Sequence, residues 1–480
     1  MKSIFELSKE GRHGVRLPKC DVDRVSLNEN LKRKSDAKLP EVSELDTVRH
    51  FTRLSDQNFS IDKNFYPLGS CTMKYNPKIE EKVASLEGFL QAHPSLLIND
   101  QTEFVQGSLE SIYETQEWLC EITGMDEFTI MPQAGAHGEM TGIMLIDAYH
   151  KEKGNKKRYV VVPDSSHGTN PATASMVGYD VITVKSDENG VMDMEKFKEA
   201  MSDEVAAVML TVPNTLGIFN PYIKEICDIA HSYDALMYYD GANLNAILGV
   251  VRPGDLGFDV MHINLHKTFG TPHGGGGPGC GPVGVKSSLQ AYMPELQVEK
   301  TDKGEYRLKK APTKTIGRVS PHFGNYLVAL KALVYMSVLG KEGLENVSKK
   351  AVLNANYIRV KLKDFYDLPY DRMCMHEVVF SAKSLQKEYG VRALDIAKYL
   401  LDFGLHAPTV YFPLIVKEAM MIEPTETESK ESIDEFISKM IEAAKLSKTD
   451  PNVLKNAPIN TPVSRPDETK AARELDICDK

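Results

Sequence analysis

Residues 259–281 have the sequence DVMHINLHKTFGTPHGGGGPGCG, and the rest of the chain is best understood in relation to them. The first part of this stretch alternates apolar and polar residues, as a half-buried β-strand does, and leads to a single lysine, Lys267. A loop with four consecutive glycines, Gly274 to Gly277, follows. An amine held at a strand end, beside a backbone that a ligand can approach closely, suits covalent capture of a carbonyl group as a Schiff base. One lysine proves little by itself, because most lysines are solvated surface groups.

A second chemical group ends the strand-like run before it. Residues 235–240, ALMYYD, read as a buried strand that finishes in Asp240. An enzyme that uses pyridoxal phosphate needs a lysine at the aldehyde of the cofactor and an acidic group at the ring nitrogen, on the opposite edge. Lys267 and Asp240 therefore predict pyridoxal phosphate as the cofactor, whereas a simple strand-end cap at Asp240 is the alternative.

Strands and helices alternate through the middle of the chain. The expected strands are 127–131, 158–163, 181–185, 205–212, 235–240 and 260–265. This alternation predicts an α/β fold with a mostly parallel sheet and helices on both faces. Ligands of such sheets bind beyond the carboxyl ends of the strands. Five polar segments each follow an expected strand and should meet at one sheet edge: AGAHGE, DSSHGTNP, PNTLG, DGAN and HKTFG.

Several longer motifs carry a resemblance to a known family. They are YPLGSCTMKYNPK (66–78), AGAHGE (134–139), SSHGTNPA (165–172), PNTLGIF (213–219), YYDGANLNAI (238–247), NLHKTFGTPHGGGGPG (264–279), HAPTVYFPLIV (406–416) and EPTETESK (423–430). From Tyr66 to Lys430 the chain resembles glycine dehydrogenase (decarboxylating), the P-protein of the glycine cleavage system. Its length resembles that of the family's separate subunit 2.

The resemblance implies a fold, a reaction and partners. The fold would be that of fold type I pyridoxal-phosphate transferases, and the reaction would be decarboxylation of glycine with transfer of the aminomethyl group to the lipoyl arm of H-protein. A homologous subunit 1, in an α2β2 heterotetramer, would be the second partner. Two alternatives stay open: another pyridoxal-phosphate decarboxylase or a desulfurase, and a non-catalytic scaffold subunit.

Three residues are the expected catalytic groups: Lys267, Asp240 and His137. Gly135 and Ala136 lie at a strand-to-helix turn, where free backbone N–H groups can hold the cofactor phosphate. By resemblance, His137 would stack on the pyridine ring; a capping or packing histidine is the alternative.

Six further residues are expected to contact the cofactor. For His167 and Thr169, a capping turn is the alternative. By resemblance, Asn214 would hydrogen-bond the phenolic oxygen of the cofactor. The six residues are His167, Thr169, Asn214, Ala242, His266 and Thr268.

No metal site is expected. His262, His266 and His273 lie within twelve residues, and the first two share one face of a strand, but no HExxH pattern completes a site. The four glycines that follow lack the lysine and hydroxyl residue of a phosphate-binding P-loop.

Composition limits the classes of protein to which the chain can belong. A net charge of −10 over 480 residues argues against general nucleic-acid binding. Seven scattered cysteines without a CxxC pair fit free thiols in a reducing cytosol. No apolar run has the length of a signal peptide or a membrane span, so we expect a cytoplasmic location and no membrane contact.

Changes of pattern predict four regions. They are an arm and linker (1–90), a large cofactor-binding domain (91–325), a smaller C-terminal domain (326–450) and a polar tail (451–480). Apolar residues at 42, 45, 48, 51 and 54 predict a helix in the arm, with a disordered tail as the alternative. Later helices are expected at 108–123, 221–233, 326–339 and 391–403, with two more near 430–447, and later strands at 376–382 and 409–416.

Overall fold

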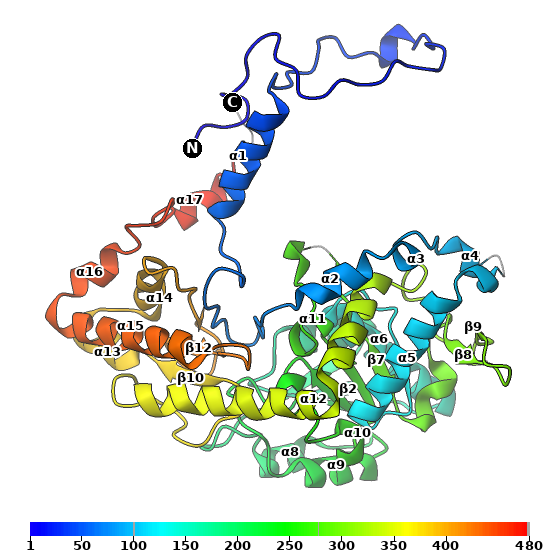
Figure 1. The fold of residues 1–480 in the computed structure, drawn as a ribbon. Helices are drawn as coiled ribbons and strands as arrows, with labels where there is room; N and C mark the ends of the chain where they lie inside the picture. The colour runs from blue at the N-terminus through cyan, green and yellow to red at the C-terminus, as the bar shows by residue number, and fades with distance from the viewer. Residues whose placement is uncertain (99–100, 277, 478–480) are drawn as a thin grey trace. The chain divides into compact units, whose positions relative to one another are not determined.

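A computed structural model describes residues 1–98, 101–276 and 278–477. The chain divides into two units, Met1–Lys63 and Asn64–Lys480 (Figure 1). The first unit contains the 3-10 helix η1 (Glu29–Leu31) and the helix α1 (Glu44–Asp56). Ser43 caps α1 by accepting a hydrogen bond from the Asp46 amide. The helix predicted in the arm is therefore confirmed.

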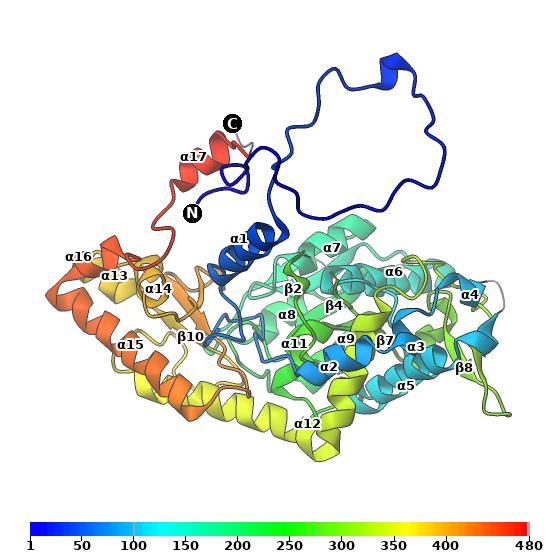
Figure 2. The same cartoon turned by 45° about the horizontal axis from the view of Figure 1, so that its top comes forward.

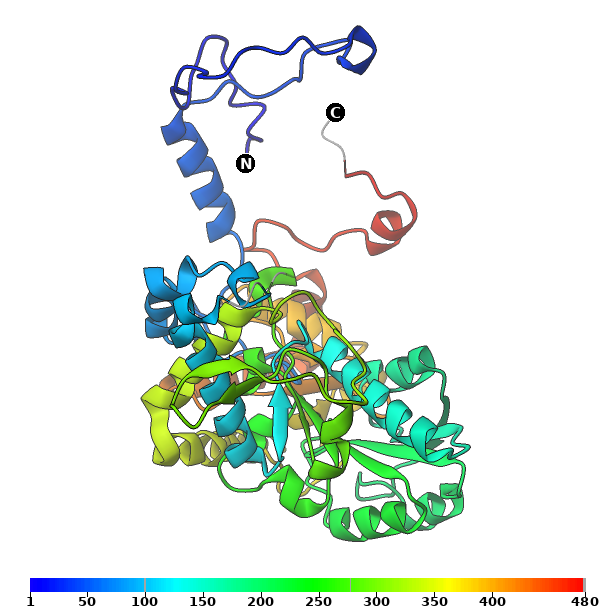
Figure 3. The ribbon, with the colours of Figure 1, turned by 90° about the vertical axis from the view of Figure 1, so that its right-hand side faces the viewer.

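The second unit is built on a seven-stranded sheet. Its order is β1-β7-β6-β5-β4-β2-β3. The five neighbouring strands β6, β5, β4, β2 and β3 run parallel to one another, while β7 is antiparallel to β6 and β1. Figure 3 shows strands of this sheet among the surrounding helices. The bounds are β1 (Glu127–Thr129), β2 (Tyr159–Pro163), β3 (Asp180–Val184), β4 (Val205–Thr211), β5 (Leu236–Gly241), β6 (Val260–Ile263) and β7 (Val283–Val285). All six predicted strands of this region are present, and β7 is additional.

Helices cover both faces of this sheet. On one face, Val160, Ala207 and Val260 pack against residues of α6 and α7, two helices that lie side by side in Figure 2. The residue that follows each of the three in its strand faces the other core, which α5, α8 and α9 complete. The helices of this part are α2 (Lys78–Ala84), α3 (Glu87–Leu90), α4 (Ser95–Ile98), α5 (Gln106–Thr123), α6 (Gly135–Lys153), α7 (Thr169–Val177), α8 (Met194–Ala200), α9 (Ile223–Ser232), α10 (Pro253–Leu256) and α11 (Leu265–Thr268), with the 3-10 helices η2 (Thr102–Phe104), η3 (Leu244–Ala246), η4 (Gly274–Gly276) and η5 (Ser287–Tyr292).

The helix α12 (Tyr326–Leu362) joins the large sheet to a second core. It kinks at Gly340, where φ is 61°, so its first part ends where the sequence predicted. The second core surrounds a three-stranded antiparallel sheet of order β10-β12-β11. Its elements are β10 (Val378–Ser381), α13 (Lys383–Tyr389), α14 (Ala393–Leu401), β11 (Thr409–Val410), β12 (Ala419–Ile422), α15 (Lys430–Thr449) and α16 (Pro451–Asn456). The helix α17 (Glu468–Arg473) follows with no buried residue. A separate hairpin pairs β8 (Val298–Lys300) with β9 (Tyr306–Leu308).

Most expected elements differ from the observed ones by one or two residues at their ends, and three of the differences have a clear physical or topological basis. The strand expected at 260–265 ends at Ile263, because the chain then enters the helical turn α11, in which the Phe269 amide bonds to the Leu265 carbonyl. The strand expected at 409–416 stops at Val410, since Tyr411 has a φ of 61°. One helix, α15, occupies the place of the two expected near 430–447, and the next helix begins only at Pro451.

Two predictions concern the chain as a whole. None of the helices in the described ranges combines the length and the apolar character that crossing a membrane requires. The six described cysteines are free thiols, while Cys478 and Gly277 lie outside the described residues.

Candidate active site

A cavity of about 100 Å³ lies at the carboxyl ends of the parallel strands. Seven predicted site residues line it: Gly135, Ala136, His167, Thr169, Asp240, Ala242 and Lys267. Six further lining residues were missed: Ser70, Glu139, Thr211, Thr215, His262 and Asn264. The polar segments that follow the strands therefore do meet at one edge of the sheet.

Lys267 lies in the short helix α11, directly after β6. Its Nζ donates a hydrogen bond to the Ser70 carbonyl oxygen at 2.8 Å. Ser70 belongs to a loop that precedes the whole sheet in sequence. Asn76 of the same loop donates a hydrogen bond to the carbonyl oxygen of Gly270, so the loop is bound both to the lysine and to the segment just after it. The amine thus has a fixed position in the cavity wall.

Asp240 is the next-to-last residue of β5 and is almost completely buried. Its carboxylate accepts hydrogen bonds from the Ala242 amide at 2.9 Å and from Asn170 and Thr211 at 3.1 Å. Its Oδ1 lies 3.4 Å from Nε2 of His262, the imidazole on the neighbouring strand. Burial raises the pKa of Asp240, but His262, the Ala242 amide and Asn170 lower it by more. The net pKa is therefore below the usual value for an aspartate. The group is therefore ionised at neutral pH.

Glu139 is a second carboxyl group in the same wall. It lies on α6, and its Oε2 accepts hydrogen bonds from Asn170 at 3.1 Å and Thr173 at 3.3 Å. Asn170 thus bridges Glu139 and Asp240 through one amide nitrogen. Burial and the charge of Asp240 raise the pKa of Glu139 to about 8. The two carboxyl groups therefore hold different charges at neutral pH.

The first turn of α6 forms another part of the wall. Gly135 and Ala136 supply backbone N–H groups that have no partner within the helix, as in any first turn. A Cβ on Gly135 would overlap the side-chain amide of Asn264, so only glycine allows this approach. The buried Oδ1 of Asn264 has no hydrogen-bond partner.

Four predicted residues do not line this cavity. His137 is half-buried, and its Nδ1 accepts a hydrogen bond from the Gln133 amide. Asn214 uses its side chain within its own turn, donating to Gly190 and accepting from the Leu216 and Ile218 amides. The ring of His266 packs edge-to-face on His273. The buried hydroxyl of Thr268 has no hydrogen-bond partner.

Two family models match the chain. The class-V aminotransferase model matches residues 132–400, and the model named glycine dehydrogenase, C-terminal domain, matches residues 347–459. A crystal structure of glycine decarboxylase (P-protein) in inhibitor-bound form aligns with a TM-score of 0.71 at 22% identity, over 86% of this chain and 92% of the other. The apo cysteine desulfurase of Thermococcus onnurineus NA1 aligns with a TM-score of 0.60 at 15% identity, over 80% of this chain and 95% of the other. The fold and the cavity define a protein of the class-V aminotransferase type, which confirms the predicted fold class.

Curated relatives narrow this class. The probable glycine dehydrogenase (decarboxylating) subunit 2 of Thermotoga petrophila is 55% identical over 473 residues, 98% of each chain. Its counterpart from Bacillus cereus strain B4264 is 56% identical over 476 residues, 98% of this chain and 96% of the relative. The chain belongs to the family of glycine dehydrogenase (decarboxylating) subunit 2, as the resemblance predicted.

The cavity fits pyridoxal phosphate, the cofactor that this family implies. It offers a lysine amine for the cofactor aldehyde and an ionised, buried carboxylate for the ring nitrogen. The first turn of α6 offers backbone N–H groups for the phosphate, and a side chain in place of Gly135 would overlap Asn264 there. The unpartnered Asn264 oxygen adds a free polar group. Among the described residues, three potential metal-ligating groups come together only at His376, Glu377 and Glu423, and not at His262, His266 and His273.

Proposed function

We propose that this chain is the lysine-bearing subunit of a glycine-cleaving enzyme, with its reaction centre in the cavity that Lys267 and Asp240 share. The reaction is pyridoxal-phosphate-dependent decarboxylation of glycine, as the family membership indicates. The observation that carries this assignment is the pairing of one lysine with one buried, ionised carboxylate in the same cavity. Identity to glycine dehydrogenases along nearly the whole chain sets aside the desulfurase and scaffold alternatives.

The proposed roles of the catalytic and cofactor-binding residues follow from their chemistry. When bound, pyridoxal phosphate supplies an electron-withdrawing ring that accepts the charge left by the departing carboxyl group. Lys267 provides the amine that holds the cofactor aldehyde, and Asp240 keeps a proton on the ring nitrogen. The amides of Gly135 and Ala136 hold the phosphate. His137 stacks on the ring; this role and the phenolic-oxygen contact of Asn214 remain predictions from the resemblance.

The remaining cofactor contacts are assigned by position. Thr211 and Asn170 fix the carboxylate of Asp240, since both donate hydrogen bonds to it. His167 and Thr169 share the lining with Lys267, and the His167 ring is hydrogen-bonded to the Thr169 hydroxyl. His266 and Thr268, although outside the lining, flank Lys267 and are proposed to meet the phosphate.

The reaction requires partners. The name subunit 2 implies a subunit 1, and we propose a homologous chain in an α2β2 heterotetramer. The aminomethyl group passes to the lipoyl arm of H-protein, whose disulfide is reduced in the transfer. We place this assembly in the cytoplasm, with residues 91–325 as the cofactor-binding domain, 326–450 as the smaller domain, and 1–90 and 451–480 as arm and tail.

Borohydride reduction of the cofactor-loaded chain, followed by peptide mapping, tests the assignment. We expect a pyridoxyl group on Lys267 and none on Lys74, a buried lysine of the neighbouring loop that serves as the internal control. The loaded chain, mixed with subunit 1 and lipoylated H-protein, should exchange the glycine carboxyl group with bicarbonate, whereas Lys267→Ala should not. A chain that binds no pyridoxal phosphate in the presence of its partner would refute the proposal.

A further inference from the structure

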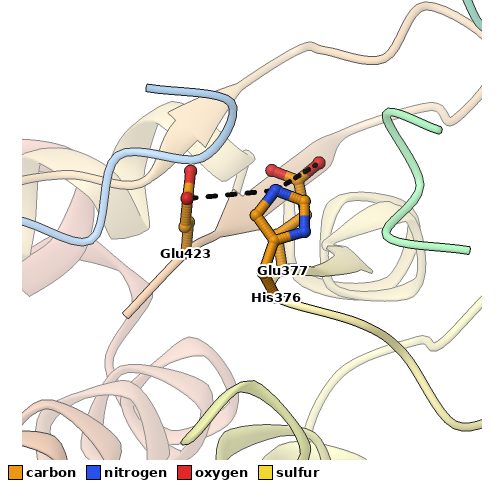
Figure 4. Close-up of side chains that lie close together, drawn as sticks. All are labelled: His376, Glu377 and Glu423. Carbon is orange, nitrogen blue, oxygen red and sulfur yellow. Dashed lines mark ion pairs between the residues drawn. The ribbon is translucent and has the colours of Figure 1, made fainter. Parts of the chain in front are cut away.

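Three completely buried polar side chains meet at the edge of the small sheet (Figure 4). His376 and Glu377 precede β10, and Glu423 follows β12. The two strands are antiparallel, with Val378 opposite Ile422, so these positions lie side by side. The His376 Nε2 is 3.9 Å from an oxygen of each glutamate. These separations are too long for direct hydrogen bonds.

The hydrogen bonds to the two carboxyl groups come from one short turn. The Ser70 amide donates to Glu377 Oε2 at 2.8 Å, and the Thr72 amide donates to Glu423 Oε2 at 2.8 Å. The Thr72 hydroxyl donates to the other oxygen of Glu423. No lysine or arginine among the described residues forms an ion pair with either glutamate. The small sheet therefore holds residues 70–72 through two buried acceptors.

A bound cation does not account for this arrangement. The three ligand atoms do lie within 4.8 Å of one another. Glu423, however, uses both oxygens on Thr72, so only Glu377 Oε1 and His376 lack partners. Two free groups are fewer than the three or four protein ligands of a zinc site. Burial and the neighbouring carboxyl group of Glu423 raise the pKa of Glu377 well above its usual value.

The turn that the glutamates hold has a strained backbone. Ser70 has a φ of 62° and Thr72 a φ of 49°, a left-handed conformation that residues other than glycine rarely adopt. Such strain persists only where surrounding contacts determine it. The same turn touches the catalytic amine, because the Ser70 carbonyl accepts the hydrogen bond from Lys267 Nζ. A continuous series of contacts thus runs from Glu377 through Ser70 to Lys267.

We propose that Glu377 and Glu423 are positioning residues for Lys267: they hold the strained Ser70–Thr72 turn so that the Ser70 carbonyl orients the lysine amine towards the cavity. The inference rests on the proposed role of Lys267. It assigns a function in the reaction to two carboxyl groups that do not line the cavity.

Three variants separate positioning from simple stability. Glu377→Ala removes the acceptor of the Ser70 amide, whereas Glu377→Gln keeps an acceptor oxygen there. Glu418→Ala is the matched control. Glu418 accepts a hydrogen bond from the Ala393 amide at 2.8 Å beside the same sheet, and it forms no hydrogen bond with the Ser70–Thr72 turn or with Lys267. The full-length chain is freed of cofactor, and the rate at which added pyridoxal phosphate attaches to Lys267 is followed by absorbance. Hydrogen exchange of the Ser70–Thr72 amides is measured in parallel, without cofactor.

We expect Glu377→Ala to slow attachment by roughly tenfold or more, since a small misplacement of a reacting group has effects of this size. It should also accelerate exchange at Ser70, and Glu377→Gln should restore both values. Glu418→Ala should lower the unfolding temperature and leave the attachment rate unchanged. Equal attachment rates in wild type and Glu377→Ala would overturn the inference, and so would a stoichiometric metal in the purified protein. A wild-type chain that never attaches the cofactor to Lys267 would instead refute the proposed function.

Discussion

Glu139 and Asp240 show how single residues of one cavity acquire different charges. Both are buried, and both accept a hydrogen bond from the same nitrogen of Asn170. Asp240 also accepts a hydrogen bond from the Ala242 amide and lies beside His262, whereas burial and the charge of Asp240 dominate at Glu139. The pKa of Asp240 is therefore lowered, and that of Glu139 is raised to about 8. This division gives one ionised acceptor and one protonated acid in the same wall.

Glu139→Gln should change how stability depends on pH in the cofactor-free chain. The folded pKa of Glu139 is raised, so its stabilising contribution is complete below the unfolded pKa near 4.5 and is lost as pH rises through about 8. Glutamine does not ionise. As pH rises across this window, the free energy of unfolding of the variant should therefore increase relative to that of wild type by a few kcal/mol, about 1.4 kcal/mol for each unit of pKa shift. Urea unfolding at several pH values measures this gain. Glu80, whose pKa is also raised to about 8, contributes equally to both proteins, and parallel curves would contradict the prediction.

At the scale of elements, the turn after β4 connects the large sheet to the small one. Gly217 in this turn has a φ of 71°, and a Cβ there would overlap the carbonyl oxygen of Glu377. The Met375 amide bonds to the Gly217 carbonyl at 2.7 Å. Thr215 of the same turn lines the cavity. The glycine therefore allows the small sheet to approach the cavity wall.

Gly217→Ala should destabilise the protein for two reasons. The left-handed backbone costs about 1 kcal/mol with any side chain, and the overlap with Glu377 adds about 2 kcal/mol. Gly154→Ala is the control, because Gly154 has a φ of 70° and a Cβ there would meet no atom within 4 Å. This variant should lose only the stability that the left-handed backbone costs. Thermal unfolding of both variants measures the difference. Equal losses would show that the turn can move away from Glu377.

The sequence predicted the elements that have strong local patterns. Long apolar runs marked β2, β4 and β5, and Gly124 ended α5 with a φ of 75° as expected. The strand β7 was missed because three residues, VGV, are too short to show a period. The strand β12 was missed because the run from 409 to 416 resembled a longer strand that Tyr411 interrupts.

The sequence predicted those parts of the site that follow from ligands binding at the carboxyl ends of parallel strands. Asp240, Lys267, Gly135 and Ala136 line the cavity because they lie at the carboxyl end of a strand or in the first turns of the helix that follows it. Ser70 lies 197 residues before Lys267, and only tertiary structure brings the two together. Glu139 sits on α6 within the quoted AGAHGE motif, so its carboxyl group was visible in the sequence, but its burial was not. The engagement of Asn214 in its own turn likewise depends on geometry that spacing does not reveal.

At the scale of the whole molecule, the first unit, Met1–Lys63, has several apolar side chains that are exposed to solvent in the isolated chain. Four of them lie on α1, where Leu45, Val48, Phe51 and Leu54 are between 41% and 57% exposed. Val48 and Phe51 are three residues apart and lie next to each other on the helix surface, whereas Leu45 and Leu54 flank them in opposite directions around the helix. Exposed apolar side chains that gather on a surface in this way mark an interaction site. The partner that the proposed function supplies is subunit 1.

Placing charges on this side of α1 should weaken the assembly with subunit 1. In the double variant Val48→Asp and Phe51→Asp, two apolar side chains that would be buried at the interface are lost, each worth about 1.5–3 kcal/mol. The dissociation constant should therefore rise at least roughly tenfold. Sedimentation of the full-length chain mixed with subunit 1 measures it, and circular dichroism checks that the helix remains. Arg53→Asp, on the opposite side of α1, is the control and should sediment as wild type does. An unchanged dissociation constant in the double variant would mean that α1 is not part of the interface and that the arm is covered by other contacts.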